Sequence, residues 1–377
     1  MKKTKLIAMY LPQYHTIPEN DEFWGKGFTD WVTVKRAKPL FSGHNQPRIP
    51  EGERYYDLTN KDVIIWQANL AKEYGIDGFG VYHYWFNNEK NLLTKPAETI
   101  RDTGCIDYFL AWDNGNWKRS WSNVDGNAWS PLADNPKTIN KGPAILIPYI
   151  LGTEQDWENH YNSVRTHFLS KTYIKVDNCP VFIIFNYDSE IHKMCEFWDF
   201  LAKKDGFGGM YFVFRNKNEK IINKTILAGK TLHVFNYEPQ TSGWSQQLSI
   251  IERIKRKIYR LLDIPLIANT YFIHDYDKVW NTLLNNAKNK YSKERYLHGA
   301  FVNYDDTPRR GNKGGRLMKN ATPLKFSSYL KEIIDISDKQ NKPFVFLTAW
   351  NEWGEGAYLE PDTVYGLSFL KAVANIK

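Results

Sequence analysis

The chain contains little cysteine and no long apolar run, and each absence excludes a class of protein. Its 377 residues include only Cys105, Cys179 and Cys195, which are too few and too scattered for a disulfide framework or a zinc site. No window of about eighteen residues is continuously apolar, so the sequence predicts no membrane span. The strand-like run at 6–10 is too short for the apolar core of a signal peptide. We therefore expect a cytoplasmic protein.

The sequence also lacks the motifs that bind phosphate groups or metal ions. No Gly-x-Gly-x-x-Gly follows the first strand-like run and no Walker loop occurs, which argues against a doubly wound nucleotide-binding sheet. Asp275-Tyr276-Asp277 superficially matches a metal motif of nucleotide-sugar transferases, but its position at a helix start favours a capping role. The histidine spacing supports no metal site, and we expect neither a metal nor another cofactor.

Aromatic residues and positive charge are, in contrast, abundant. Phe, Trp and Tyr make up 15% of the chain, with 14 Trp, which favours a surface that binds flat rings such as sugars. The formal net charge is +8, but the basic residues are spread along the chain and no nucleic-acid motif occurs. We expect a saccharide partner and no nucleic acid. The basic stretch 246–262 indicates an ordinary helix, with peripheral contact to the inner membrane as the sharper alternative.

Eight strand-like runs alternate with helical patterns, and no linker interrupts them. This alternation predicts the α/β class and a single (β/α)8 TIM barrel spanning 1–377, with long loops at the carboxyl ends of the strands. The segment 17–50 is expected to be a long, irregular and functional loop. Strands are expected at 5–10, 76–85, 107–112, 180–185, 210–214, 232–235, 299–302 and 344–348, and helices at 60–74, 94–101, 156–168, 190–203, 246–262, 275–289 and 322–338.

Nearly every predicted strand ends in polar or aromatic residues. In a (β/α)8 barrel the active site is built from the loops that follow the strands, so these residues are candidates for substrate contact. Amide side chains offer sugar hydroxyls both a donor and an acceptor, and aromatic rings stack on sugars. The candidates along the first seven strands are Tyr10, Gln13, His15, Trp31, Tyr82, His83, Trp85, Trp112, Asn114, Asn116, Trp117, Asn186, Asn236, Asp305 and Arg309.

Two of these candidates have a plain structural alternative. A lone histidine such as His83 is often structural, although the aromatic residues beside it support substrate contact equally well. Asp305 is either part of a polar turn or a residue that grips sugar hydroxyls. In the second case, Arg309 or Arg310 would hold an acidic or phosphorylated group.

The last predicted strand leads into Trp-Asn-Glu-Trp-Gly-Glu-Gly at 350–356. Two carboxylates on one loop suit acid/base work on a glycosidic bond, where one handles the proton of the leaving group and the other serves the anomeric side. We therefore predict that Glu352 and Glu355 are catalytic. Their spacing does not set the distance between the carboxylates, so it predicts neither retention nor inversion. The neighbours expected to contact the sugar are Trp350, Asn351 and Trp353.

Motifs along the whole chain occur in an order that resembles a known family. They are Leu-Pro-Gln-Tyr-His at 11–15, Phe-Trp-Gly-Lys-Gly-Phe-Thr-Asp-Trp at 23–31, Gln-Pro-Arg at 46–48, Tyr-Asp-Leu at 56–58, Tyr-Gly-Ile-Asp-Gly-Phe at 74–79, Tyr-His-Tyr-Trp-Phe at 82–86, Thr-Pro-Arg-Arg-Gly at 307–311 and the run 350–361. Together they resemble the WbsX family, which is associated with bacterial O-antigen and capsule gene clusters and is commonly labelled glycosyltransferase. Its domain is similar to glycoside hydrolase family 99, the endo-α-1,2-mannosidases, which are (β/α)8 barrels.

The resemblance implies roles for the paired glutamates. Glu352 would be the base that activates the sugar 2-hydroxyl to attack the anomeric carbon from within the substrate. Glu355 would protonate the leaving oxygen and then act as base for the acceptor, without a metal. The chain departs from the family at 112–117, where Gly115 stands in place of a glutamate, which puts the substrate contacts of that loop in doubt.

These observations favour a glycan-active enzyme of bacterial surface polysaccharide (O-antigen, lipopolysaccharide or capsule) metabolism. It would cleave or transfer a glycosyl residue by retaining, 2-hydroxyl-assisted acid/base catalysis. One alternative is a nucleotide-sugar-dependent glycosyltransferase of O-antigen biosynthesis. A second is a non-catalytic glycan-binding barrel, which would keep the tryptophans without needing both glutamates.

Overall fold

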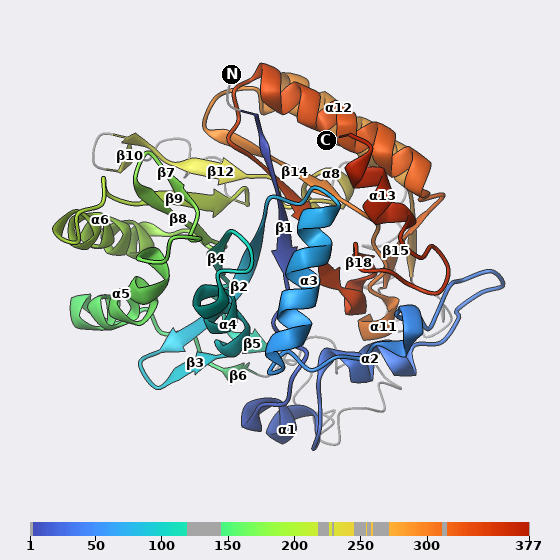
Figure 1. Ribbon diagram of the computed structural model, residues 1–377, viewed down its shortest axis with the longest axis horizontal. Helices are drawn as coiled ribbons and strands as arrows, with labels where there is room; N and C mark the ends of the chain where they lie inside the picture. The colour runs from blue at the N-terminus through green and yellow to red at the C-terminus, as the bar shows by residue number, and fades with distance from the viewer. Residues whose placement is uncertain are drawn as a thin grey trace.

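Eight parallel strands close into a barrel in the computed structural model (Figure 1). The structure describes residues 3–118, 145–217, 226–227, 230–244, 254, 258, 271–310 and 315–376. Around the barrel the strand order is β1, β2, β4, β8, β9, β12, β14, β16, and β1 pairs with β16 to close the ring. The eight strands are β1 (Lys5–Tyr10), β2 (Gly78–Asn87), β4 (Tyr108–Trp112), β8 (Cys179–Ile184), β9 (Tyr211–Arg215), β12 (His233–Phe235), β14 (Tyr296–Phe301) and β16 (Phe344–Thr348). The predicted TIM barrel is confirmed.

Helices connect successive strands and cover the outside of the barrel (Figure 1). Their caps follow from the sequence. The side chain of Asn60 accepts from the backbone of Asp62 at the start of α3, and Asp275 caps α10 by accepting from Lys278. The expected capping role of Asp275 is therefore confirmed. The outer helices are α3 (Lys61–Glu73), α4 (Lys95–Thr103), α5 (Glu154–Phe168), α6 (Ser189–Lys204), α8 (Gln240–Gly243), α10 (Tyr276–Asn285), α12 (Pro323–Lys339) and α13 (Ser368–Ala374).

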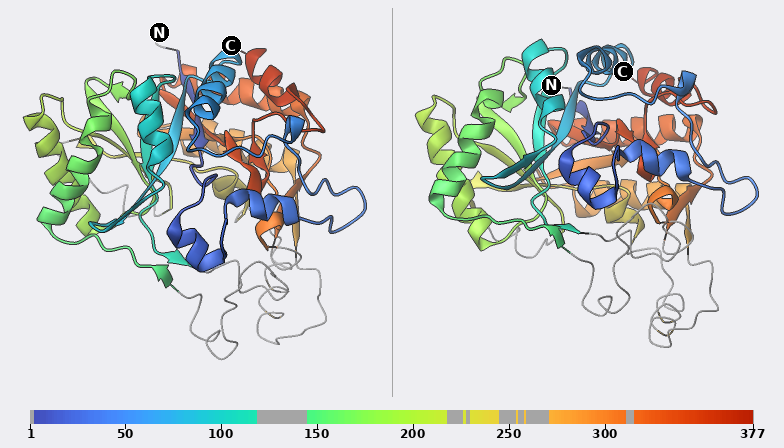
Figure 2. Two further views of the ribbon diagram at one scale, coloured as in Figure 1. Left: turned by 60° about the horizontal axis from the view of Figure 1, so that its bottom comes forward. Right: turned by 90° about the horizontal axis from the view of Figure 1, so that it is seen from below.

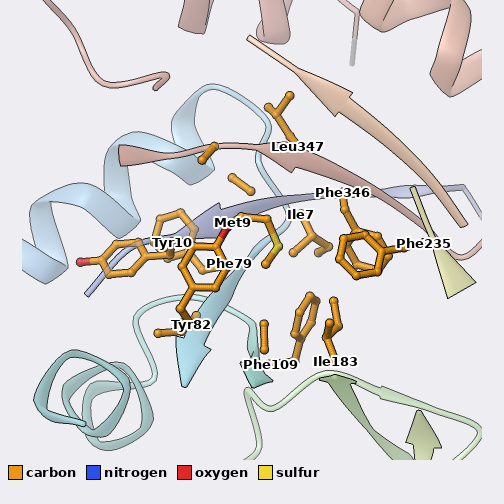
Figure 3. Packing of buried hydrophobic residues seen from close by; sticks show 14 of the residues in the cluster. Ile7, Met9, Tyr10, Phe79, Tyr82, Phe109, Ile183, Phe235, Phe346 and Leu347 are labelled. Atoms are coloured by element: carbon orange, nitrogen blue, oxygen red, sulfur yellow. The ribbon is translucent and has the colours of Figure 1, made fainter. Parts of the chain in front are cut away.

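Large apolar side chains fill the inside of the barrel. Figure 3 shows Ile7, Phe109, Ile183, Phe235 and Phe346 converging from five strands, and all five are buried. The ring centroid of Phe346 lies 5.7 Å from that of Phe109 and 5.3 Å from that of Phe235. Such a barrel interior is a packed core, and the opening for a ligand lies beyond it, where the strands end.

The carboxyl ends of the strands carry additional short elements. In Figure 1, β1 runs downward, and α1, α2 and α11 lie toward its lower end, on the side away from the chain termini. Figure 2 shows α1 and α2 from that side. The short elements of this side are α1 (Pro18–Trp24), α2 (Asp30–Arg36), α11 (Thr307–Arg310), β3 (Lys90–Leu92), β5 (Trp117–Lys118), β6 (Ile145–Ile147), β13 (Phe272–Asp275), β15 (Arg316–Lys319), β17 (Asn351–Glu352) and β18 (Ala357–Tyr358). Three further short strands precede barrel strands instead: β7 (Lys175–Val176) pairs with the start of β8, and β10 (Ile226–Leu227) and β11 (Lys230–Thr231) pair with each other before β12.

The segment 17–50 is more regular than its sequence predicts. It contains α1 and α2, so the expectation of a wholly irregular loop is wrong. Pro18 stands at the first position of α1, where its missing N–H costs nothing, and acidic residues occupy the first turn. Lys35 and Arg36 lie in the last turn of α2, where they favour the helix dipole.

The sequence predicts no membrane-spanning helix and leaves peripheral membrane contact through 246–262 as an alternative. No helix in the described part of the chain is long and apolar enough to cross a membrane. The basic stretch 246–262, and with it the peripheral membrane contact, lies outside the described residues except for 254 and 258.

Candidate active site

A cavity of about 770 Å³ opens among the loops that follow the barrel strands. Its volume is typical of a site for a small molecule or part of an oligosaccharide. The lining includes Glu352 and Glu355 after β16, Arg309 of α11, and Tyr82 and Tyr84 of β2. The two glutamates therefore line one cavity, as expected for residues that follow the last barrel strand.

One arginine connects the acidic residues at the base of this cavity. Nη1 of Arg309 donates to Oε1 of Glu355 at 2.7 Å, and Nη2 donates to Oδ2 of Asp30 at 3.0 Å and to Oε2 of Glu352 at 3.5 Å. The side chain of Glu352 is 6% exposed and that of Glu355 is 23% exposed. One carboxylate is therefore nearly enclosed, while the other is more open to the cavity.

Gly354 allows this ion-pair cluster to lie against the loop. A Cβ atom on Gly354 would lie 2.6 Å from Oδ2 of Asp30 and 2.7 Å from Nε of Arg309. Any side chain at this position would push apart the arginine and the aspartate. The glycine between the two glutamates is thus explained by close packing of Asp30 and Arg309.

The two glutamates differ in electrostatic environment. Burial raises the pKa of the Glu352 carboxyl to about 8, and the negative charge of Glu355 acts in the same direction. The positive charge of Arg309 opposes both effects. A carboxyl that keeps its proton beside an ion-paired carboxylate is an arrangement suited to acid/base chemistry.

The structure brings seven of the predicted site residues to the cavity. Gln13 lies at the exit of β1 and donates from Nε2 to the Tyr84 hydroxyl at 2.9 Å. The Tyr82 hydroxyl lies 2.9 Å from that of Tyr237. The predicted residues that line the cavity are Gln13, Tyr82, Asn116, Trp117, Arg309, Glu352 and Glu355.

His83, Trp85 and Trp112 lie outside the cavity lining and pack around His160 of α5. Successive side chains of a strand point to opposite faces, so Tyr82 and Tyr84 face the cavity while His83 and Trp85 face α5. Nε2 of His83 lies 2.9 Å from Nε2 of His160, and Trp85 stacks on the same imidazole. Burial lowers the pKa of His83 to about 3. His83 is therefore neutral and part of the packing between β2 and α5.

The aromatic and amide residues of the last loop are buried and stabilise its backbone. Trp350 is fully buried against Phe79, with ring centroids 5.3 Å apart. Trp353 stacks on Tyr358 and donates from Nε1 to Glu360 at 2.6 Å. None of these lines the cavity. They fix the backbone that carries the glutamates.

Asn351 has the same supporting role. Its Oδ1 accepts from the backbone N–H of Leu11 at 2.7 Å, and its Nδ2 donates to the Leu11 carbonyl at 3.0 Å. The amide is therefore occupied by the β1 exit. It joins the last loop to the first one, which closes the ring of loops above the barrel.

Asp305 also lies outside the cavity lining. Its Oδ2 accepts from Gln46 at 2.7 Å and lies 2.9 Å from Nε2 of His44, and Thr307 donates to Oδ1 at 2.6 Å. Burial alone would raise its pKa, but the hydrogen bond from His44 and the charge of Arg48 outweigh burial and lower it to about 2. Asp305 is an ionised anchor for the segment 44–48.

The remaining candidates are engaged in protein contacts away from the cavity lining. Asn114 and Asn186 hydrogen bond reciprocally, with Nδ2 of Asn114 donating to the Asn186 carbonyl at 2.8 Å. Asn236 accepts from Asn216 at 2.8 Å. The others donate to or pack among neighbouring elements and are buried: Tyr10, His15, Trp31 and Trp112.

Several cavity residues are absent from the sequence-based candidates. Asp113 directly follows β4, and Arg215 is the last residue of β9. Their positions at strand ends could therefore have predicted that they line the cavity. Tyr84 shares a face with Tyr82, and a period of two would have selected it. No local signal places the others, because distant loops bring them together. Arg310, the alternative to Arg309 in the sequence analysis, also lines the cavity. The additional lining residues are Leu11, Asn20, Trp24, Asp30, Tyr84, Asp113, Lys118, Leu146, Phe185, Arg215, Tyr237, Pro239, Gln240, Trp244, Tyr304 and Arg316.

Comparison with known proteins identifies the family. The sequence profile described as "Glycosyltransferase WbsX" matches residues 6–373. The chain belongs to the WbsX family. A relative described as "Uncharacterized protein WxcX", from Xanthomonas campestris pv. campestris, is 30% identical over 376 residues, which cover 97% of this chain and 48% of that protein. This WbsX-family chain therefore spans about half the length of the curated relatives it matches.

Solved structures share the barrel of the WbsX-family chain. A "Glycoside hydrolase-like protein" has a TM-score of 0.58 and 11% identity, covering 100% of this chain and 94% of its own. The GH99 endo-alpha-mannosidase from Bacteroides thetaiotaomicron has a TM-score of 0.55 and 12% identity, covering 98% of this chain and 95% of its own. At these identities the likeness concerns the fold.

A metal site in a protein needs several ligating side chains at one place. Among the described residues, no group of three or more His, Cys, Asp or Glu side chains is arranged to hold a metal ion. Three acidic residues of the cavity, Asp30, Glu352 and Glu355, instead converge on the guanidinium of Arg309.

Proposed function

We propose that this WbsX-family barrel is a glycan-active enzyme of bacterial surface polysaccharide metabolism that cleaves or transfers a glycosyl residue with Glu352 and Glu355. The observation that carries the proposal is the pair itself. Two carboxylates in different environments open onto one cavity and share the guanidinium of Arg309. Pairs of titratable groups whose surroundings separate their pKa values are the usual equipment for acid/base chemistry.

The proposed reaction proceeds with retention through the sugar 2-hydroxyl. Glu352 takes the proton of that hydroxyl, whose oxygen attacks the anomeric carbon of the same residue. Glu355 gives a proton to the departing glycosidic oxygen, so that the C–O bond breaks and a 1,2-anhydro sugar forms. Water or an acceptor hydroxyl then opens this ring at the anomeric carbon. Glu355 accepts the proton of the incoming group, and Glu352 returns its proton to O2.

The electrostatics support a proton on Glu352. Burial raises the pKa of Glu352 towards the neutral range, which makes its carboxylate a stronger base than an exposed glutamate. Arg309 contacts Glu355 closely and Glu352 more distantly. In the free protein this proton therefore resides on Glu352. The proposed cycle requires substrate binding to move it to Glu355, on the side of the leaving group.

Isosteric substitutions of each glutamate test the proposal. Glu352→Gln and Glu355→Gln remove one carboxylate each and keep the shape of the side chain, and each should lower kcat by about 10²- to 10⁴-fold. The assay uses a panel of α-linked oligosaccharides and the corresponding disaccharyl fluorides, with product stereochemistry read by NMR. Fluoride needs no protonation to leave, so the loss in Glu355→Gln should shrink with fluorides while the loss in Glu352→Gln persists.

The outcomes separate the candidate functions. Unchanged glycan binding and unchanged function in both variants would overturn the catalytic proposal in favour of a glycan-binding barrel. Product with inverted configuration would overturn the 2-hydroxyl mechanism. Rescue of Glu352→Gln by fluorides, instead of Glu355→Gln, would show that the roles are exchanged.

A nucleotide-sugar-dependent transferase is the second candidate. The description of the family as glycosyltransferase and the arginines of the cavity favour it. This candidate predicts saturable binding of a nucleoside diphosphate by calorimetry, which the hydrolase-like mechanism does not need. Absence of that binding in a protein that still binds oligosaccharide would exclude it.

A further inference from the structure

Beside the paired glutamates, aromatic rings and arginines line one sector of the cavity. Arg215, Tyr237, Trp244, Tyr304 and Arg316, which we call the cationic wall, all contribute to the cavity lining. They come from β9, the loop after β12, the end of α8, the loop after β14, and β15. In the barrel order β9, β12 and β14 are consecutive neighbours (Figure 1), so these residues form one sector of the loop face.

Ring contacts hold the two arginines in place. The guanidinium carbon of Arg215 lies 5.1 Å from the ring centroid of Phe185 and 5.9 Å from that of Tyr237. The guanidinium carbon of Arg316 lies 5.2 Å from the ring of Trp244, which in turn lies 4.9 Å from the ring of Tyr304. Cation–π contacts orient a guanidinium without using its N–H donors. Within the described residues, these ring contacts therefore leave the N–H donors of both arginines available to a ligand.

Most other charged residues around the cavity have a partner of opposite charge. Arg309 pairs with Asp30, Glu352 and Glu355, and Arg310 pairs with Asp306 at 2.8 Å, while Lys118 also belongs to the lining. Within the described residues, neither Arg215 nor Arg316 forms an ion pair with a carboxylate.

Asp113 is the remaining acidic residue of the lining. Burial raises its pKa, against the opposing charges of Arg215 and Lys217. This carboxyl therefore offsets the positive charge of the sector only in part. The cavity therefore has an acidic cluster around Arg309 and, beside it, a sector in which Asp113 and Asp306 offset the positive charge only in part.

We propose that the cationic wall is an anion subsite and that the glycan acted on here carries a carboxylate or phosphate group next to the residue that is cleaved or transferred. This inference rests on the proposed function, because it names the substrate class of the same cavity. Planar guanidinium groups bind carboxylate and phosphate oxygens through paired hydrogen bonds. The rings of Tyr237 and Trp244 supply apolar surface for the sugar that bears the charge.

The test measures binding separately from catalysis. Glu352→Gln protein, which should not turn over, is applied to an array of bacterial surface oligosaccharides in which each acidic member is printed beside its carboxyl-reduced form. Phosphorylated oligosaccharides and a nucleoside diphosphate form two further arms. We expect acidic members to bind more tightly than their reduced partners, by roughly 10- to 100-fold for one charge-assisted contact, with the preference weakening as salt rises.

Arginine variants assign the preference to the wall. Arg215→Gln and Arg316→Gln, each in the Glu352→Gln background, should abolish the preference for acidic over reduced members. Arg54→Gln is the matched control, because Arg54 makes a cation–π contact 4.2 Å from the ring centroid of Trp66 and lies outside the cavity lining. It should keep the full preference.

Each outcome bears on the inference. Equal binding of acidic and reduced members in every pair, or a preference that survives both wall variants, overturns it. A wall-dependent preference for the phosphorylated oligosaccharides or the nucleoside diphosphate supports the anion subsite and identifies phosphate as the source of charge. If Glu352→Gln and Glu355→Gln prove fully active while the acidic preference stands, only the proposed catalytic roles fail.

Discussion

The last loop and the cationic wall both use aromatic residues, but for different purposes. In the loop 349–361, Trp350 and Trp353 are buried and their rings support the backbone that carries Glu352 and Glu355. In the cationic wall, the rings line the cavity beside arginines. The tryptophans adjacent in sequence to Glu352 and Glu355 are therefore part of the scaffold. The rings available to a sugar come from other loops.

Two tryptophan substitutions test whether a ring supports the fold or serves the ligand, and one of them should cause a large loss of stability. Trp353→Ala should lower the free energy of unfolding by about 3–5 kcal/mol, because it empties a buried site and removes the partner of Glu360. Trp117→Ala should cost less than about 1 kcal/mol but weaken oligosaccharide binding roughly tenfold, since Trp117 lines the cavity. Urea unfolding and calorimetry measure the two quantities. Equal stability losses would contradict the distinction between rings that support the last loop and rings that line the cavity.

A change of pH tests the burial of Glu352. Its pKa is raised to about 8 from an unfolded value of 4.5, so between these pH values the folded protein holds a proton that the unfolded chain releases. The stabilising effect of this protonated form is complete below about pH 4.5 and is lost as the pH rises through about 8. Glu352→Gln removes this dependence. Unfolding free energies measured from pH 5 to pH 8 should therefore fall more steeply for the wild type than for the variant.

The difference between the two curves isolates Glu352 from other buried groups. Burial also raises the pKa values of Glu238 and Glu360 to about 7, but these groups are present in both proteins. Parallel curves for the wild type and Glu352→Gln would show that Glu352 is ionised in the folded protein. That result would remove the electrostatic argument for a proton on Glu352.

The smallest effect is expected at Gly115, where the resemblance to the family implies a glutamate. Among the described residues, a Cβ atom on Gly115 would meet Nδ2 of Asn186 alone, at 3.6 Å, which is ordinary van der Waals contact. Gly115→Glu should therefore change stability by less than about 0.5 kcal/mol. Gly354→Ala is the contrasting control, because its Cβ would overlap Asp30 and Arg309, and it should be clearly destabilised in a thermal melt. A large loss of Tm in Gly115→Glu would show that this loop is packed as tightly as the last one.

Much of the barrel could be predicted from the sequence. The eight runs found by composition and period correspond to β1, β2, β4, β8, β9, β12, β14 and β16, although β14 begins at Tyr296, three residues before the expected start. Strands buried on both faces read as nearly continuous apolar runs, so their existence is a local property. The positions of Glu352 and Glu355 at a strand exit follow from the same signal. Their catalytic roles stay a prediction.

Local composition and periodicity specify which segments become strands and helices, and which polar residues follow them. Which of those residues face the cavity depends on how the strands pair and close into a barrel. His83 and Tyr84 are neighbours in sequence, yet one packs against α5 and the other lines the cavity, because strand side chains alternate and the barrel closes around one face. The contacts of Arg309 with Asp30 span 279 residues. No local pattern contains such a pair, since the closed ring of loops alone brings its members together.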